Sequence, residues 1–229
     1  SSVAGTALYE HLDTIITAIL EGLCEVEESE VEKELEHANM IISSVEELDG
    51  HENTLDILED TLKSEETKMR LYSSILVGTL CKNEYLEIEE HITVLWKCLI
   101  SQFSDPCAEV VKNCWNAFNT ATKRLASGDQ VRLVPDLKMC IYQAIDPKNR
   151  RDPTYTLPGF CLPKGLATVV ALYREGILNG SPELKEQAII GLKEAIQYTS
   201  QPALKPSVVQ ITGPLIRVLG ERYTPNIKT

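Results

Sequence analysis

Apolar residues recur along most of this chain at the spacing of one face of an α-helix. In residues 8–23 they stand at i, i+4, i+7, i+8, i+11 and i+15, which places them on one stripe of a helix. A later segment, residues 29–48, begins with Ser29 and has acidic residues in its first turn, a favourable helix start. No hairpin dipeptide lies between runs of alternating apolar residues. The pattern predicts an all-α protein.

Three of the predicted helices share a start signal and an apolar spacing. Their starts, at Ser64, Ser104 and Ser181, lie 40 and then 77 residues apart, or about one and two units of a helix-pair repeat. The shared positions, at offsets 7, 11 and 14, are Leu71, Ile75 and Gly78, then Val111, Trp115 and Phe118, then Ala188, Leu192 and Ala195. This favours a HEAT-like (armadillo-type) solenoid of roughly ten to twelve helices. The alternative is an irregular helical bundle with accidental spacing.

A solenoid has consequences for function. Each helix pair buries its apolar faces only by stacking on its neighbours, and the stack leaves long surfaces exposed, so such proteins commonly serve as docking scaffolds. We expect residues 1–229 to form a single solenoid and to be a fragment of a larger protein.

One long segment, residues 146–163, breaks the helical pattern. Its four prolines prevent a continuous helix, and a segment this long without helix is usually functional or disordered. It carries three basic residues, Lys148, Arg150 and Arg151, and we expect it to display Tyr155 and Phe160 as well. Because Arg and Tyr are favoured at binding hot spots, the segment is a candidate contact for phosphate or an acidic partner. The alternative is a mobile exposed loop.

Charge divides the chain into two parts. Residues 1–104 hold 23 Asp and Glu against six Lys and Arg, whereas residues 105–229 hold 11 against 16. Within the acidic half, residues 25–36 hold seven Glu and one Lys, which indicates either a solvated helix face or a dock for a basic partner. The net charge of −12 argues against sequence-independent binding of nucleic acid, and we expect no direct contact with DNA.

Catalytic chemistry finds little support in the sequence. Phosphate-binding, nucleophile-elbow and zinc-protease motifs are absent, and the seven cysteines and four histidines show no metal-ligand spacing. Because the cysteines lie mostly in apolar helical sequence, we expect buried, reduced thiols in a cytoplasmic protein. We predict no enzyme, no cofactor, no metal and no membrane contact. A catalytic thiol is the alternative from another functional class.

Residues 210–222, "QITGPLIRVLGER", place two arginines near the end of this otherwise acidic chain. At 100° per residue the predicted buried stripe consists of Ile211, Leu215, Val218 and Leu219. Arg217 falls off that stripe, Pro214 suits a first helical turn, and Arg222 follows at or beyond the helix end. An Arg217–Glu221 pair would contribute only about 0.2–0.5 kcal/mol, so stability alone hardly requires this arginine. Partner docking and surface decoration remain equal alternatives for both arginines.

Residues 156–229 resemble a known family. The stretches that carry the resemblance are "LPGFCLPKG" (157–165) and "LKPSVVQITGPLIRVLGER" (204–222), and the preceding residues are similar in helical style. The family is that of the very large HEAT-repeat translational activators of general amino-acid control, which associate with ribosomes and activate the kinase of initiation factor two alpha.

The resemblance implies a partner and a site. It implies that this chain is the region that binds the kinase's RWD domain, a small α/β module, and promotes kinase activation during amino-acid starvation. Other RWD-containing proteins become candidate partners, and ribosome contact is expected through parts of the protein outside this chain. Family binding depends on a basic residue, which we place at Arg217 or Arg222, with Arg174 as the next candidate. The rival hypothesis is a transport or scaffold module that binds a basic peptide through the acidic half.

Overall fold

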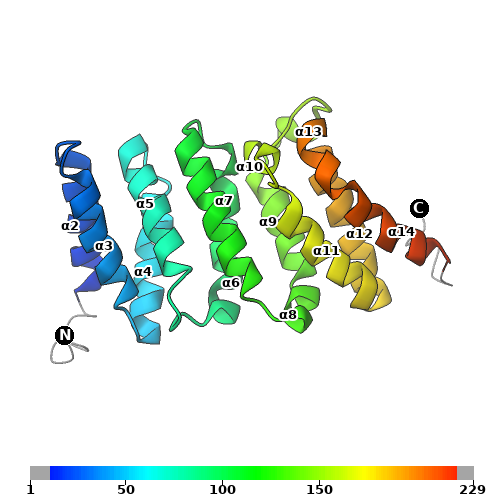
Figure 1. Ribbon diagram of the computed structural model, residues 1–229, viewed down its shortest axis with the longest axis horizontal. Helices are drawn as coiled ribbons and strands as arrows, with labels where there is room; N and C mark the ends of the chain where they lie inside the picture. The colour runs from blue at the N-terminus through cyan, green and yellow to red at the C-terminus, as the bar shows by residue number, and fades with distance from the viewer. Residues whose placement is uncertain (1–10, 221–229) are drawn as a thin grey trace.

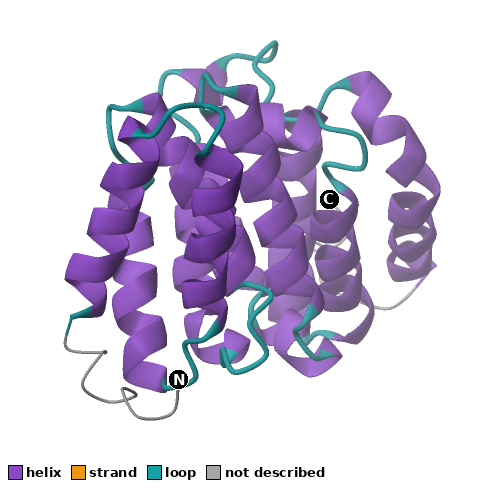
Figure 2. Cartoon of the chain, turned by 60° about the vertical axis from the view of Figure 1, so that its left-hand side comes forward, coloured by secondary structure: helices purple, strands orange, loops and turns teal. Residues whose placement is uncertain are grey.

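Helices account for every regular element in the part of the chain that the computed structural model describes, residues 11–220 (Figures 1 and 2). They form pairs, and the first helices of the pairs are α2 (Leu12–Glu25), α4 (Leu48–Thr61), α6 (Ile88–Ser101), α9 (Val134–Ala144) and α12 (Pro182–Gln197). The second helices are α3 (Val31–Ser43), α5 (Thr67–Leu80), α7 (Ala108–Lys123), α11 (Ala167–Asn179) and α14 (Val208–Gly220). Shorter pieces connect them: α8 (Ser127–Arg132), α10 (Pro158–Cys161), α13 (Gln201–Leu204) and the 3-10 turns η1 (Gln102–Ser104), η2 (Asn149–Arg151) and η3 (Lys205–Ser207).

The pairs stack side by side into two layers, which can be followed from left to right in Figure 1. In the first-helix layer α2 packs against α4, and α9 packs between α6 and α12. In the second-helix layer α5 packs between α3 and α7, and α14 packs against α11. Neighbouring pairs bury one another's apolar stripes, and this arrangement confirms the predicted all-α solenoid. Within residues 11–220 no helix combines the length and the apolar content needed to cross a bilayer.

The three helices predicted to start after Ser64, Ser104 and Ser181 were expected to occupy equivalent positions in the repeat, and two of them do. The starts at Ser64 and Ser104 lead into α5 and α7, which pack side by side in the second-helix layer. The start at Ser181 leads into α12, where the Ser181 hydroxyl accepts a hydrogen bond of 3.3 Å from the Leu184 amide. However, α12 belongs to the first-helix layer, so the third match is wrong. The shared apolar spacing is common to amphipathic helices and does not distinguish the layers.

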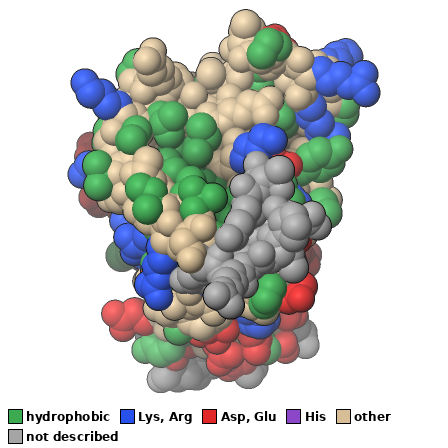
Figure 3. All heavy atoms as spheres, turned by 90° about the vertical axis from the view of Figure 1, so that its right-hand side faces the viewer, with side chains coloured by type: hydrophobic (Ala, Val, Ile, Leu, Met, Phe, Trp, Pro, Cys, Tyr) green, Lys and Arg blue, Asp and Glu red, His purple; other side chains and the backbone are tan. Residues whose placement is uncertain are grey.

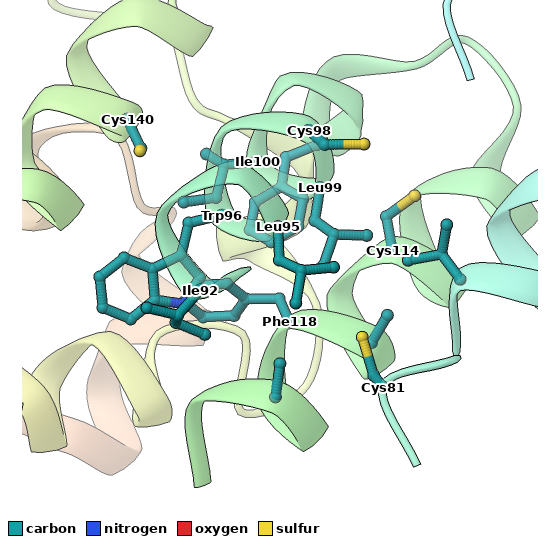
Figure 4. Packing of buried hydrophobic residues seen from close by; sticks show 14 of the residues in the cluster. Cys81, Ile92, Leu95, Trp96, Cys98, Leu99, Ile100, Cys114, Phe118 and Cys140 are labelled. Carbon is teal, nitrogen blue, oxygen red and sulfur yellow. The ribbon is translucent and has the colours of Figure 1, made fainter. Parts of the chain in front are cut away.

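A chain of aromatic rings forms the middle of the core. The ring centroids of Trp96 and Phe118 lie 6.3 Å apart, and Phe103 packs edge-on against both Phe118 (5.8 Å) and Phe160 (5.9 Å). The indole N–H of Trp96 donates to the Thr122 hydroxyl at 2.8 Å, so this fully buried ring leaves no polar atom unpaired. Figure 4 shows Trp96 and Phe118 among the aliphatic side chains of α6. These contacts fix α6, α7 and α10 relative to one another.

Residues 146–163 divide into a mostly exposed first part, up to Thr154, and a second part that packs into the core. The segment contains η2 and α10, and Leu157 and Phe160 are fully buried, so the prediction that Phe160 is exposed is wrong. The Leu157 amide donates to the Tyr198 carbonyl at 2.8 Å, and the half-buried Tyr155 ring packs edge-on against that of Tyr198. The prolines do break the helix as expected, but the apolar residues between them fill the core beside Phe103.

Candidate partner-binding surfaces

Helix α14 carries the arginine that the sequence singles out. Pro214 lies inside this helix, six residues after its first residue Val208, so the prediction that it occupies a first turn is wrong. The chain is already helical at η3, which has a proline at its start and leads directly into α14. Pro214 cannot donate to the carbonyl of Gln210, but Gln210 is exposed and water can satisfy that oxygen.

The buried stripe of α14 is narrower than predicted. Ile211 and Val218 are buried, at 7% and 2% exposure, and Leu215 is half-buried against the core. Leu219 is 57% exposed, so its predicted burial is wrong. The reason is that α14 packs mainly against one long helix, α11, within the described residues.

The opposite side of α14 is apolar and exposed, which the sequence analysis missed. Val209 is 81% exposed, Ile216 68% and Val208 44%, and Leu219 joins them. At about 100° per residue Val209 and Ile216 share one side of the helix, and Arg217 lies at the margin of that side. We call Val208, Val209, Ile216, Arg217 and Leu219 the α14 edge. Figure 3, a view onto this end of the molecule, shows hydrophobic side chains gathered with Lys and Arg near them.

The predicted arginines fall at different places relative to this edge. Arg217 is exposed in the last turn of α14. Arg222, like the Glu221 expected to pair with Arg217, lies outside the described residues. Arg174 is on the adjacent helix α11, where its Nη2 atom lies 3.5 Å from Oε1 of Glu175 and its side chain is 40% exposed. The structure therefore brings Arg174 and Arg217 onto two helices that pack side by side.

The basic residues of the 146–163 segment have separate positions. Arg150 is held by the end of α9: it donates to the carbonyls of Ile145 (3.1 Å) and Tyr142 (3.0 Å), and its guanidinium lies 3.8 Å from the Tyr142 ring centroid. These contacts satisfy the last carbonyls of the helix. Lys148 and Arg151 are exposed beside it.

The acidic run of residues 25–36 spans the end of α2, a turn and the start of α3. Its residues 27–30 are all exposed, and Glu34 makes a contact of 3.6 Å with His37, two residues that are about half exposed. Since Glu32 and Glu34 lie in the first turn of α3, they also complement the helix dipole. Exposure of this run fits both sequence-based interpretations, a solvated helix start and a dock for a basic partner.

Four of the seven cysteines, Cys81, Cys98, Cys114 and Cys140, are buried thiols. Burial raises the pKa of Cys81 and of Cys98 to about 12 and that of Cys140 to about 11, and it raises the pKa of Cys114 well above its ordinary value. A buried thiol that stays protonated is a poor nucleophile. In the part of the chain that the structure covers, no three His, Cys, Asp or Glu side chains group in a way that suits a metal ion.

Comparisons with known proteins give a consistent result. The family model described as "Stalled ribosome sensor GCN1-like, HEAT repeats" matches residues 1–164. The chain is 38% identical over 231 residues to the human protein named "Stalled ribosome sensor GCN1", and 32% identical over 226 residues to the "eIF-2-alpha kinase activator GCN1" of Dictyostelium discoideum. The yeast protein of the latter name is 29% identical over 230 residues. These alignments cover 99–100% of this chain but only 8% of each relative. The names of these relatives describe a sensor and a kinase activator, in agreement with the prediction of a non-catalytic protein.

Proposed function

The chain belongs to the GCN1-like family of HEAT-repeat proteins, and from this premise we propose that it docks the RWD domain of an initiation factor two alpha kinase. The docking surface is the α14 edge together with Arg174 on the adjacent helix α11. In this proposal the chain is a non-catalytic scaffold, and kinase activation follows from docking. A cytoplasmic location belongs to the same proposal.

The partner class is supported by the names of two relatives. The proteins from Dictyostelium discoideum and yeast are both named as activators of the eIF-2-alpha kinase, and this chain aligns with each of them over nearly its whole length. An activator that is not an enzyme must act by binding. Ribosome contact, which the name of the human relative suggests, is proposed for other parts of the full-length protein.

The α14 edge is the single observation that carries the choice of surface. Val209 and Ile216 are among the most exposed large hydrophobic residues of the described chain, and they lie beside an arginine. Apolar side chains that surround an arginine are the composition of a binding hot spot, in which apolar contact supplies affinity and the cation fixes orientation. Contiguous exposed apolar surface of this kind marks interaction sites on soluble proteins.

Charge favours an acidic patch on the partner. Neither α14 nor the 3-10 turn before it contains an acidic residue, whereas Lys205 and Arg217 are exposed in them. Charge complementarity would speed encounter and set the orientation of the RWD domain. Arg174 adds a second cation on the neighbouring helix, although Glu175 lies close to it.

The test is the affinity of the purified 229-residue chain for the purified kinase RWD domain, measured by isothermal titration calorimetry. Arg217→Ala should weaken binding by about 30-fold or more, because losing a central arginine from a desolvated pair costs about 2–5 kcal/mol. Ile216→Ala should weaken binding as well, through lost apolar contact.

The control is Lys63→Ala, which removes a cation just after α4 whose side chain is 56% exposed, far along the chain from α11 and α14. It should leave the affinity within about twofold, since an exposed rim charge contributes little. Circular dichroism and thermal unfolding establish that each variant is folded. Undiminished binding by a folded Arg217→Ala, Arg222→Ala double variant would refute this site.

A further inference from the structure

The two layers of the solenoid differ in charge. In the described residues the first helices α2, α4, α6, α9 and α12 hold 14 Asp and Glu against four Lys. The second helices α3, α5, α7, α11 and α14 hold five against seven Lys and Arg, and three of those five acids lie in α3 alone. The second-helix layer from α5 onward is therefore a basic surface on an acidic protein.

A groove is open in this basic layer between α7 and α11. It has a volume of about 230 Å³, enough for one or two side chains. We call it the α7–α11 groove, and its lining includes Trp115, Asn119, Lys123, Gln130, Lys164 and Thr168. Lys123 and Lys164 are exposed and come from opposite walls, one at the end of α7 and the other just before α11. No Asp or Glu lines this groove.

The backbone at Lys164 is held in an unusual conformation. Its φ of 63° is in the left-handed region, where a residue other than Gly, Asn or Asp is uncommon and costs about 1 kcal/mol or more. The following Gly165 fixes the turn, because its carbonyl accepts a hydrogen bond of 3.0 Å from the indole N–H of Trp115. A lysine thus stands at the groove rim where glycine would fit with less strain.

A second polar hollow lies on the other side of α7, between α5 and α7. Its lining includes Lys82, Asn113, Asn116 and Thr120, so amide and hydroxyl groups flank α7 on both sides. Asn113 is tied to Ser74 of α5 by a hydrogen bond of 3.1 Å, and Asn116 is exposed. Amide side chains spaced along a layer can pair with the N–H and C=O groups of an extended chain.

We propose that the α7–α11 groove binds an extended acidic peptide segment of a partner protein, which crosses α7 at the exposed Asn116. Lys123 and Lys164 pair with its carboxylates, and Trp115 contacts an aliphatic side chain between them. A peptide is favoured over RNA because the groove offers two isolated lysines on a chain of net charge −12, whereas nucleic acid requires many clustered cations. This site is separate from the α14 edge and does not depend on the proposed RWD docking.

The test uses the 229-residue chain and a fluorescein-labelled peptide of six Glu-Ala repeats, with binding followed by fluorescence anisotropy. The Lys123→Glu, Lys164→Glu variant should bind at least tenfold more weakly than the unmodified chain. The matched control, Lys97→Glu, Lys193→Glu, makes the same charge change with two exposed lysines of the first-helix layer, and it should stay within twofold. Peptide binding should also change the intrinsic fluorescence through Trp115, because Trp96 is fully buried.

A second variant separates ligand binding from a structural role. Lys164→Gly relieves the left-handed strain, so its melting temperature should be unchanged or higher, while its affinity for the peptide falls at least threefold. All of these variants should bind the RWD domain with unchanged affinity. The proposal is overturned if the peptide does not bind, if both double variants lose affinity equally, or if a twelve-nucleotide RNA binds more tightly than the peptide.

Discussion

At the scale of single residues, a buried ion pair ties successive second helices together. Nε of Arg70 lies 2.6 Å from Oδ2 of Asp105, and their side chains are only 11% and 3% exposed. Arg70 also donates to the carbonyls of Ser64 and Glu65, at 2.9 Å each, and Asp105 accepts from the Cys107 amide at 2.7 Å. The pair therefore joins the start of α5 to the start of α7.

Removing one partner of this pair should be costly. Asp105→Ala leaves the Arg70 guanidinium without its carboxylate, so the free energy of unfolding, measured by urea denaturation, should fall by about 3–5 kcal/mol. Asp129→Ala, which removes a carboxylate from an exposed pair with Arg132, should cost less than about 1 kcal/mol. Equal losses in the free energy of unfolding from the two substitutions would show that the buried pair stabilises the fold no more than the exposed pair does.

A buried histidine makes stability depend on pH. Desolvation lowers the pKa of His51 below its ordinary value, and electrostatic interactions with His91 and Arg124 lower it further, against a 2.9 Å hydrogen bond to the Val45 carbonyl. The folded chain therefore binds fewer protons at His51 than the unfolded chain does. Stability is fully present above about pH 6.5, the unfolded pKa, and decreases as the pH falls below it.

The variant His51→Gln should show this dependence directly. Its free energy of unfolding should decrease less between about pH 6.5 and 5 than that of the unmodified chain, by up to about 1.4 kcal/mol per pH unit. The control is His37→Gln, which changes an exposed histidine and should leave the slope as it was. Parallel pH profiles for all three proteins would contradict the account.

At the scale of elements, the short helix α10 fits the core only because Gly159 has no side chain. A Cβ atom at this position would lie 2.4 Å from Cγ of Phe103, closer than two non-bonded carbon atoms approach in proteins. The same close approach brings the Phe160 ring against Phe103. The 146–163 segment thus contributes to the aromatic core through α10.

Substituting this glycine should loosen the segment. Gly159→Ala should lower the free energy of unfolding by about 1–3 kcal/mol, since an added methyl group must displace a buried ring. Gly78→Ala, inside α5 with open space at its Cβ position, should instead raise it by about 0.5–1 kcal/mol. Thermal melts of the two variants test the contrast, and a shift in the same direction for both would contradict it.

The positions of the helices along the chain were predicted better from the sequence than the contacts that each helix makes in the fold. Apolar spacing correctly identified α2, α5 and α7, because periodicity reports which face of a helix is apolar. It does not report what covers that face, which is why Leu219 was assigned to the core and α12 to the wrong layer. Similarly, the prolines of residues 146–163 indicated a helix break, but only the packing against Phe103 and Tyr198 reveals that the later part of the segment, around Leu157 and Phe160, is buried.

At the scale of the whole molecule, net charge differs both between the two halves of the chain and between the two helix layers. The sequence showed the difference between residues 1–104 and 105–229, since a count along the chain is sufficient for it. The difference between the two layers was not visible, because first and second helices alternate along the chain and their charges average within any segment. The basic surface is thus the second-helix layer from α5 onward, and most of it lies in the later half of the chain.

Both proposed sites follow from this distribution. The α14 edge combines apolar exposure with an arginine at one end of the stack, whereas the α7–α11 groove combines two lysines with amide groups along its basic layer. Neither site contains a reactive thiol or a cluster of metal ligands among the described residues. The two proposed sites would take partners of similar charge but different shape.

Hydrogen exchange of the 229-residue chain, with and without the kinase RWD domain, tests the central claim most directly. The account predicts that the RWD domain slows exchange in residues 208–220 and in the adjoining residues 167–179, and that it leaves residues 25–60 unchanged. Slowed exchange confined to the acidic residues 25–60 would contradict the account and favour a scaffold that binds a basic partner instead.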